Sequence, residues 1–124
     1  MRFLAWVACV HMANQYFYVM SRLDELEALL DQQPDDPFLI YALAREYELQ
    51  LATMQALLMY EHLVTNYPAY IATYYQYAKL LHTAGNRHEA KRLLEKGIEM
   101  GIQEKDHHAV AEMKSLLQFW TEEE

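Results

Sequence analysis

Apolar side chains recur at helical spacing along most of the chain after residue 20. Two segments place them at positions i, i+3, i+4 and i+7: Ile40, Leu43, Ala44 and Tyr47, and then Tyr74, Tyr77, Ala78 and Leu81. This spacing gathers the apolar side chains on one face of an α-helix. We therefore expect an all-α protein built from amphipathic helices.

The expected helices are bounded by residues that interrupt or cap helices. The interruptions are Pro34, Pro68, Gly85 and Gly101. Asp36 and Asn86 stand where a side chain caps a helix N-terminus, and Pro37 suits the first turn of a helix. A last helix, at about residues 106–120, has an apolar stripe formed by Val110, Met113, Leu116, Leu117 and Trp120.

The same features return at a fixed offset of 34 residues, which indicates an internal repeat. The aligned pairs are Pro34 with Pro68, Ile40 with Tyr74, Ala44 with Ala78, and Ala56 with Ala90. Small residues at the alanine positions let paired helices approach closely, whereas larger ones would overpack the contact. The sequence predicts two copies of one helical hairpin, residues 37–70 and 71–104.

These positions resemble the tetratricopeptide-repeat (TPR) family, and the stretch from Met20 is similar to small bacterial proteins of that build. The first copy matches the family pattern at Ile40, Leu43, Ala44, Tyr47, Ala56 and Tyr60. Leu63 replaces a usual small residue, and Ile102 stands where a closing proline belongs. The resemblance implies an antiparallel α-hairpin solenoid with two full repeats and flanking capping helices.

Residues 1–19 are set apart as an N-terminal extension, and residues 20–124 are the expected TPR-like domain. The apolar run from Phe3 to Val10 is too short to span a bilayer. Three interpretations stay open: an extra helix packed on the array, a weak leader, or sequence translated upstream of the natural start. Ser21, with Asp24 three residues later, offers a helix cap near the start of the domain.

Charge and cysteine usage exclude several classes of function. The formal net charge of −8 opposes binding to nucleic acid and to anionic membranes. The basic residues Arg87, His88, Lys91, Arg92 and Lys96 alternate with glutamates, which favours a solvated helix face over a phosphate site. The single cysteine, Cys9, excludes an intramolecular disulfide framework and fits a cytoplasmic protein.

No motif for catalysis or for a cofactor stands out in the sequence. A phosphate-binding glycine loop, a nucleophile elbow and a His-Glu-x-x-His helix are all missing. His108 and Glu112 lie one helical turn apart, but two ligands do not make a metal site. We therefore expect a protein that is not an enzyme and that needs neither a metal nor another cofactor.

The resemblance implies that the protein binds a protein or peptide partner in a groove. Residues one place after the apolar stripe lie about 100° further around each helix and face that groove. They are Phe38, Tyr41, Arg45 and Glu48 in the first copy and Ala72, Tyr75, Lys79 and His82 in the second. Aromatic side chains beside cations suit a segment that bears apolar groups and a carboxylate. The alternative is a structural role through a homodimer, formed by apolar surface at Leu116, Leu117, Phe119 and Trp120.

Overall fold

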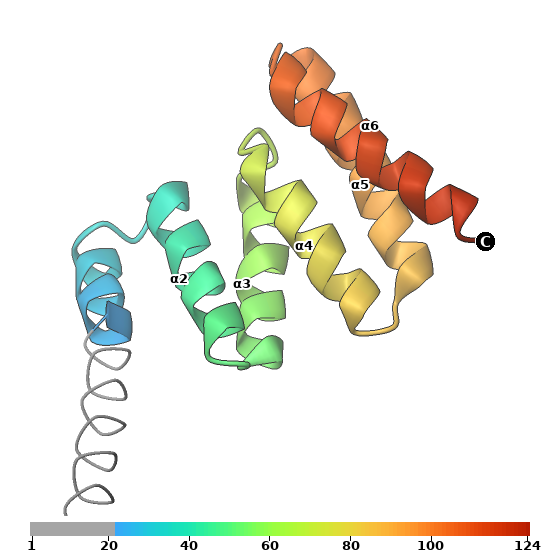
Figure 1. The fold of residues 1–124 in the computed structure, drawn as a ribbon. Helices are drawn as coiled ribbons and strands as arrows, with labels where there is room; N and C mark the ends of the chain where they lie inside the picture. The colour runs from blue at the N-terminus through green and yellow to red at the C-terminus, as the bar shows by residue number, and fades with distance from the viewer. Residues whose placement is uncertain (1–21) are drawn as a thin grey trace, which may run out of the picture.

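The computed structural model describes residues 22–124, which form α-helices joined by short turns (Figure 1). Residues 22–32 are helical, and the helices that follow are α2 (Pro37–Leu49), α3 (Thr53–Asn66), α4 (Ala72–Thr83), α5 (Arg87–Gln103) and α6 (His107–Glu122). Consecutive helices pack on one another along the chain. The predicted all-α hairpin solenoid is confirmed.

The N-terminus of α2 forms as the sequence predicts. The Asp36 carboxylate accepts a hydrogen bond from the backbone N–H of Phe38 at 2.9 Å, and Pro37 occupies the first turn. The predicted side-chain cap at Asn86 is wrong, because only the backbone carbonyl of Asn86 accepts a bond, from the N–H of Ala90. The predicted Ser21 cap lies outside the described residues.

Three helices end in the same left-handed turn. After α4, Gly85 has a φ of 92°, and the N–H groups of Gly85 and its successor return to the carbonyls of His82 and Leu81. Leu51 has a φ of 59° after α2, and Lys105 has a φ of 58° after α5. A residue with a Cβ adopts this conformation at a cost of about 1–2 kcal/mol. The turn after α2 is therefore strained where the turn after α4 is not.

Each hairpin has its own cluster of buried side chains. The first consists of Ile40, Ala44, Ala56, Tyr60 and Leu63. The second consists of Ile71, Tyr74, Ala78, Leu81, Ala90, Leu93, Leu94, Met113 and Trp120. The four alanines that repeat between the copies have no exposed surface, as expected for close contacts between paired helices.

The second hairpin closes around a glycine where the first has a leucine. A Cβ atom on Gly97 would lie 2.5 Å from the Cβ of Tyr74, so no larger residue fits there without movement of the backbone. The residue 34 places earlier is Leu63, which is fully buried in the same cluster as Ile40. Tyr74 and Gly97 in the second hairpin thus occupy the positions that Ile40 and Leu63 occupy in the first.

Helix α5 continues beyond the end predicted for it. The break expected at Gly101 is wrong, since α5 reaches Gln103. A Cβ atom on Gly101 would lie 2.7 Å from Cγ2 of Val110, so this glycine lets α6 pack closely on α5. Ile102 occupies the place of the closing proline but retains its N–H and does not end the helix. As a result α5 has 17 residues and α3 has 14.

Helix α6 covers the open side of the second hairpin. The Asp106 side chain caps its N-terminus, and Val110, Met113 and Trp120 are buried. The expectation that Trp120 adds to an exposed apolar surface is wrong, because only 5% of this side chain is exposed. Phe119, by contrast, is 56% exposed.

The helical segment 22–32 packs against α2 on the other side of the array. Arg22 donates a hydrogen bond to Glu46 at 3.2 Å, and the Tyr47 hydroxyl donates to Glu27 at 3.3 Å. Leu30 packs against the first core cluster. The N-terminal extension at residues 1–19 lies outside the described residues. Within residues 22–124, no helix combines the length and the apolar character needed to cross a membrane.

Candidate functional site

The eight residues predicted to face a groove are all at least partly accessible on α2 and α4. Those most open to solvent are Phe38, Ala72 and Lys79, and those partly buried are Tyr41, Arg45, Glu48, Tyr75 and His82. We refer to these eight residues as the groove face. Their surroundings differ along α2 and α4, and the differences decide which of them are available to a ligand.

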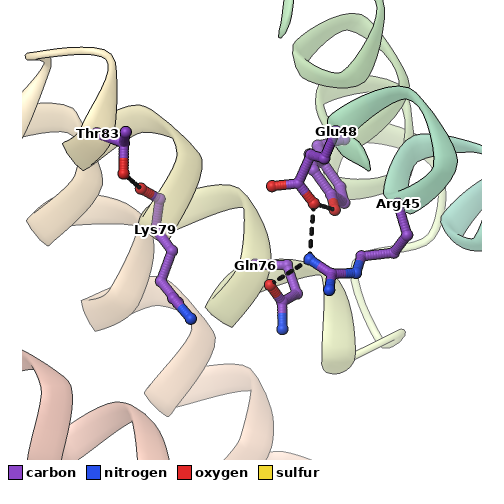
Figure 2. A network of polar contacts seen from close by, with 6 residues as sticks. Arg45, Glu48, Gln76, Lys79 and Thr83 are labelled. Atoms are coloured by element: carbon purple, nitrogen blue, oxygen red, sulfur yellow. Dashed lines mark hydrogen bonds and ion pairs between the residues drawn. The ribbon is translucent and has the colours of Figure 1, made fainter. Parts of the chain in front are cut away.

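A chain of polar contacts links the two hairpins at the groove face. The Tyr60 hydroxyl donates to Oε2 of Glu48 at 2.6 Å, and Arg45 donates to the same oxygen at 2.8 Å. Arg45 also donates to Oε1 of Gln76 on α4 at 2.7 Å (Figure 2). This network fixes α2 relative to α4 and engages the guanidinium of Arg45.

The network shifts the protonation equilibria of its members. Burial and the Glu48 carboxylate raise the pKa of Tyr60, so its hydroxyl stays protonated as a donor. Partial desolvation is the largest influence on the pKa of Arg45 and lowers it, but the charge of Glu48 and the interactions with Tyr60 together outweigh it, so the net shift is upward. Arg45 is therefore a fixed cation whose charge Glu48 already balances, and it is less available to a ligand anion than the sequence suggested.

Aromatic rings lie close together at the α2 end of the groove face. The ring of Tyr41 is 5.7 Å from that of Tyr70, edge to face, and 6.3 Å from that of Tyr60. Desolvation raises the pKa of Tyr41, and the charge of Glu48 adds to the shift while Arg45 opposes it. Tyr41 is thus held by neighbouring rings with part of its surface open to solvent.

Lys79 is the accessible cation of the groove face. Its ammonium lies 5.2 Å above the centroid of the Tyr75 ring, within the range of a cation–π contact. Figure 2 shows its side chain extending from α4, the helix that also carries Gln76. Among the residues that the structure describes, Lys79 has no carboxylate partner. Its positive charge is therefore open to a ligand.

A cleft of about 450 Å³ opens between α4 and α6, beside Lys79. It is lined by Tyr75, His108, Ala111, Glu112, Ser115 and Leu116. The pair His108 and Glu112 lies at this cleft with Nε2 and Oε1 3.2 Å apart. Residues 22–124 contain no group of three potential metal ligands. The cleft thus offers mainly apolar surface with a few polar groups.

The α6 wall of this cleft was missed from the sequence. The groove face was predicted from the 34-residue register of two copies, and α6 does not keep that register because α5 is longer than α3. The amphipathic pattern of α6 was the available signal, since its polar face carries His108 and Glu112 beside Leu116. At the other end of α4, His82 is already stacked on Trp120 of α6, with ring centroids 4.2 Å apart.

A second and smaller hollow, of about 300 Å³, lies between α3 and α5. Its lining is Glu61, Val64, Thr65, Tyr77, Glu89, Arg92, Leu93 and Lys96. Arg92 donates to Glu89 at 3.2 Å, so part of the basic cluster noted in the sequence is paired with a carboxylate. Acidic and basic groups alternate here, which gives this hollow no dominant charge.

Comparison with known proteins identifies relatives of this arrangement. A solution structure of a tetratricopeptide repeat domain protein from Salinibacter ruber shares 32% identity, with a TM-score of 0.67, over 68% of this chain and 86% of that one. A crystal structure of the tetratricopeptide repeat domain protein from the same organism shares 31% identity, with a TM-score of 0.65, over 68% of this chain and 93% of that one.

A solution structure of a protein from Bordetella parapertussis shares 25% identity, with a TM-score of 0.70, over 82% of this chain and 88% of that one. No family model matches the sequence, and no curated protein matches it. The fold, the 34-residue repeat and the similarity to the Salinibacter ruber domain agree. This chain belongs to the tetratricopeptide-repeat family, whose helical domains generally serve as protein-interaction modules.

Proposed function

We propose that the protein is a non-catalytic adaptor that binds a peptide or helix of another protein along α2, α4 and α6. The observation that carries this proposal is the position of Lys79. Its unpaired ammonium lies over the Tyr75 ring, and Tyr75 also lines the apolar cleft between α4 and α6. A cation beside an apolar cleft suits a ligand with an apolar side chain near a carboxylate.

The rest of the groove face extends this surface toward α2. Phe38 is 61% exposed, and the partly exposed ring of Tyr41 offers further aromatic area. Aromatic side chains in such places provide much of the energy of peptide binding. Arg45 contributes chiefly by holding α2 against α4, because Glu48 and Gln76 occupy its donors.

Affinity capture from the lysate of the native host, followed by mass spectrometry, tests the proposal. The partner captured by the parent should be lost with Tyr75→Ala or Lys79→Ala, each of which should weaken binding by about 1–3 kcal/mol. Lys96→Ala, which removes an exposed lysine from the α3–α5 hollow, is the matched control and should bind like the parent. Equal binding by all three variants would contradict the proposal.

Self-association through the terminal helix is the second candidate. It rests on Phe119, which is 56% exposed, with the half-buried Leu116 and Leu117 nearby on α6. Trp120 does not contribute, because it is buried against the second hairpin. Size-exclusion chromatography with light scattering separates the candidates: a dimer that Phe119→Ser converts to a monomer would favour self-association.

A further inference from the structure

Four exposed positions at one corner of the first hairpin carry large apolar side chains. They are Leu49 at the end of α2, Leu51 in the turn, and Met54 and Leu58 in the first turns of α3, with exposed fractions of 73%, 88%, 68% and 58%. We call these four residues the apolar corner. Met54 and Leu58 are one helical turn apart and so lie on the same face of α3.

The second hairpin shows that the fold does not require these apolar residues. The residues 34 places later are Thr83, Gly85, His88 and Arg92, and all four are exposed. Both hairpins form the same left-handed turn, yet the first places Leu51 at a positive φ where the second has glycine. Lys105 adopts the same conformation after α5, so Leu51 is set apart by its apolar side chain, which is 88% exposed. This exposure points to a contact with something outside residues 22–124.

The described part of the chain begins beside this corner. Arg22 donates to Glu46, which is one helical turn before Leu49 on α2. In Figure 1 the helical segment 22–32 starts at the end of the molecule where the turn between α2 and α3 lies. The residues upstream of Arg22 therefore reach the molecule close to the apolar corner.

The upstream residues have the composition needed to cover such a surface. From Phe3 to Val19 the chain contains no Asp, Glu, Lys or Arg, and Phe3 to Val10 is its longest apolar run. The twelve residue steps from Val10 to Arg22 span about 40 Å when extended. Arg22 contacts Glu46, three residues before Leu49, so a segment of this length is long enough to reach the corner.

We propose that the run from Phe3 to Val10 docks on the apolar corner and buries it. Docking would remove from water both the four side chains of the corner and the apolar side chains of the run, which accounts for an apolar residue at the exposed position 51. This surface lies on α2 and α3 away from the cleft between α4 and α6. Substitutions at the corner can therefore be tested separately from substitutions at the cleft, which is lined by residues of α4 and α6.

The reactivity of Cys9, the single cysteine, tests the docking because it lies within the run. In the full chain, Ellman's reagent should label Cys9 at least about tenfold more slowly under native conditions than in denaturant. The double variant Met54→Ser, Leu58→Ser should raise the native rate toward the denatured one. Ile102→Ser, which changes an apolar residue exposed to the same 58% far from the corner, should leave the rate unchanged.

Two results would overturn the proposal: native labelling as fast as in denaturant, or protection that the double variant leaves intact. Protection that disappears on dilution, together with a dimer mass in light scattering, would assign the corner to a second copy and also overturn it. Circular dichroism shows whether the double variant remains folded. A disulfide formed in the monomer between Cys9 and Leu58→Cys on mild air oxidation, but not with Ile102→Cys, tests the docking independently of the serine variants.

Discussion

The two hairpins use one backbone plan but fill the space between their helices in different ways. In α2 and α3, Ile40 and Leu63 share the buried cluster, whereas in α4 and α5 the Tyr74 ring lies directly on Gly97. The Cβ of Tyr74 and Sδ of Met113 leave no room for a side chain at position 97, whereas the leucine at the equivalent position 63 is fully buried in the first hairpin. The comparison teaches that the repeat preserves the helical hairpin and the close alanine contacts, while the size of a residue at an equivalent position depends on its own neighbours, including those from α6.

The hairpins also differ in the side chains that they expose to solvent at equivalent positions. The corner formed by Leu49, Leu51, Met54 and Leu58 is apolar, and the equivalent exposed residues after α4 are polar or glycine. The network through Glu48 likewise has no counterpart in the second hairpin, where His82 occupies that place and stacks on Trp120. These differences between equivalent positions show that the surfaces of the two hairpins diverge where their cores are alike.

Gly97→Leu gives the second hairpin the residue of the first and should have the largest effect. The new Cβ would lie 2.5 Å from the Cβ of Tyr74, so we expect the free energy of unfolding to fall by about 3 kcal/mol or more. Urea denaturation followed by circular dichroism measures the loss.

A second substitution tests whether the Cβ of Tyr74 or its ring limits the space at position 97. Tyr74→Ile removes the ring but keeps the Cβ atom, and Sδ of Met113 also lies 2.7 Å from a Cβ at position 97. Tyr74→Ile combined with Gly97→Leu should therefore be no more stable than Gly97→Leu alone. Recovery of stability in the double variant would contradict this account.

The strained turn should yield an effect of intermediate size. Gly85→Ala places a Cβ at a positive φ with no atom within 4 Å, so only backbone strain changes, and we expect a loss of about 1–2 kcal/mol. Leu51→Gly should be more stable than Leu51→Ala by about 1–2 kcal/mol for the same reason. Comparing the two variants at position 51 removes the contribution of the leucine side chain, and equal unfolding midpoints would exclude strain at this turn.

The Tyr60 hydroxyl should have the smallest effect. Tyr60→Phe removes one hydrogen bond to Glu48, which keeps Arg45 as a partner, so we expect a loss of about 1 kcal/mol at neutral pH. Burial raises the pKa of Tyr60, so its contribution is present below the ordinary tyrosine pKa of about 10 and is lost as the pH rises beyond it. The variant should therefore lose less stability than the parent between about pH 9 and pH 11. If the free energies of unfolding of the parent and of Tyr60→Phe fall in parallel over this pH range, the account is contradicted.

The periodic part of the fold was predictable because it follows from local spacing. The 34-residue offset located both hairpins, and the buried alanines are at the positions that the spacing assigned to close contacts. The end of α5 was not predictable from Gly101, since its role depends on contact with Val110. Nor does the sequence reveal a left-handed turn at Leu51, because leucine rarely adopts this conformation.

The candidate site was predictable only as a stripe of residues on α2 and α4. The sequence identified Tyr75 and Lys79 as neighbours on one face, and the structure adds the cleft that Tyr75 shares with α6. The sequence also placed Arg45 on the groove face as a cation for a ligand carboxylate, whereas Glu48 and Gln76 accept hydrogen bonds from its guanidinium. The contact between Arg45 and Gln76 joins residues 31 places apart, and no local pattern encodes it.

The most direct test of the proposed binding mode is an amide chemical-shift titration of the full chain with the partner segment captured from the host. The account predicts the largest shifts at residues that line the cleft between α4 and α6, including Tyr75 and Ala111, and at Lys79 beside it. Thr65 and Arg92, in the hollow between α3 and α5, should stay unchanged. Shifts confined to that hollow, with the cleft residues silent, would contradict binding at the groove face.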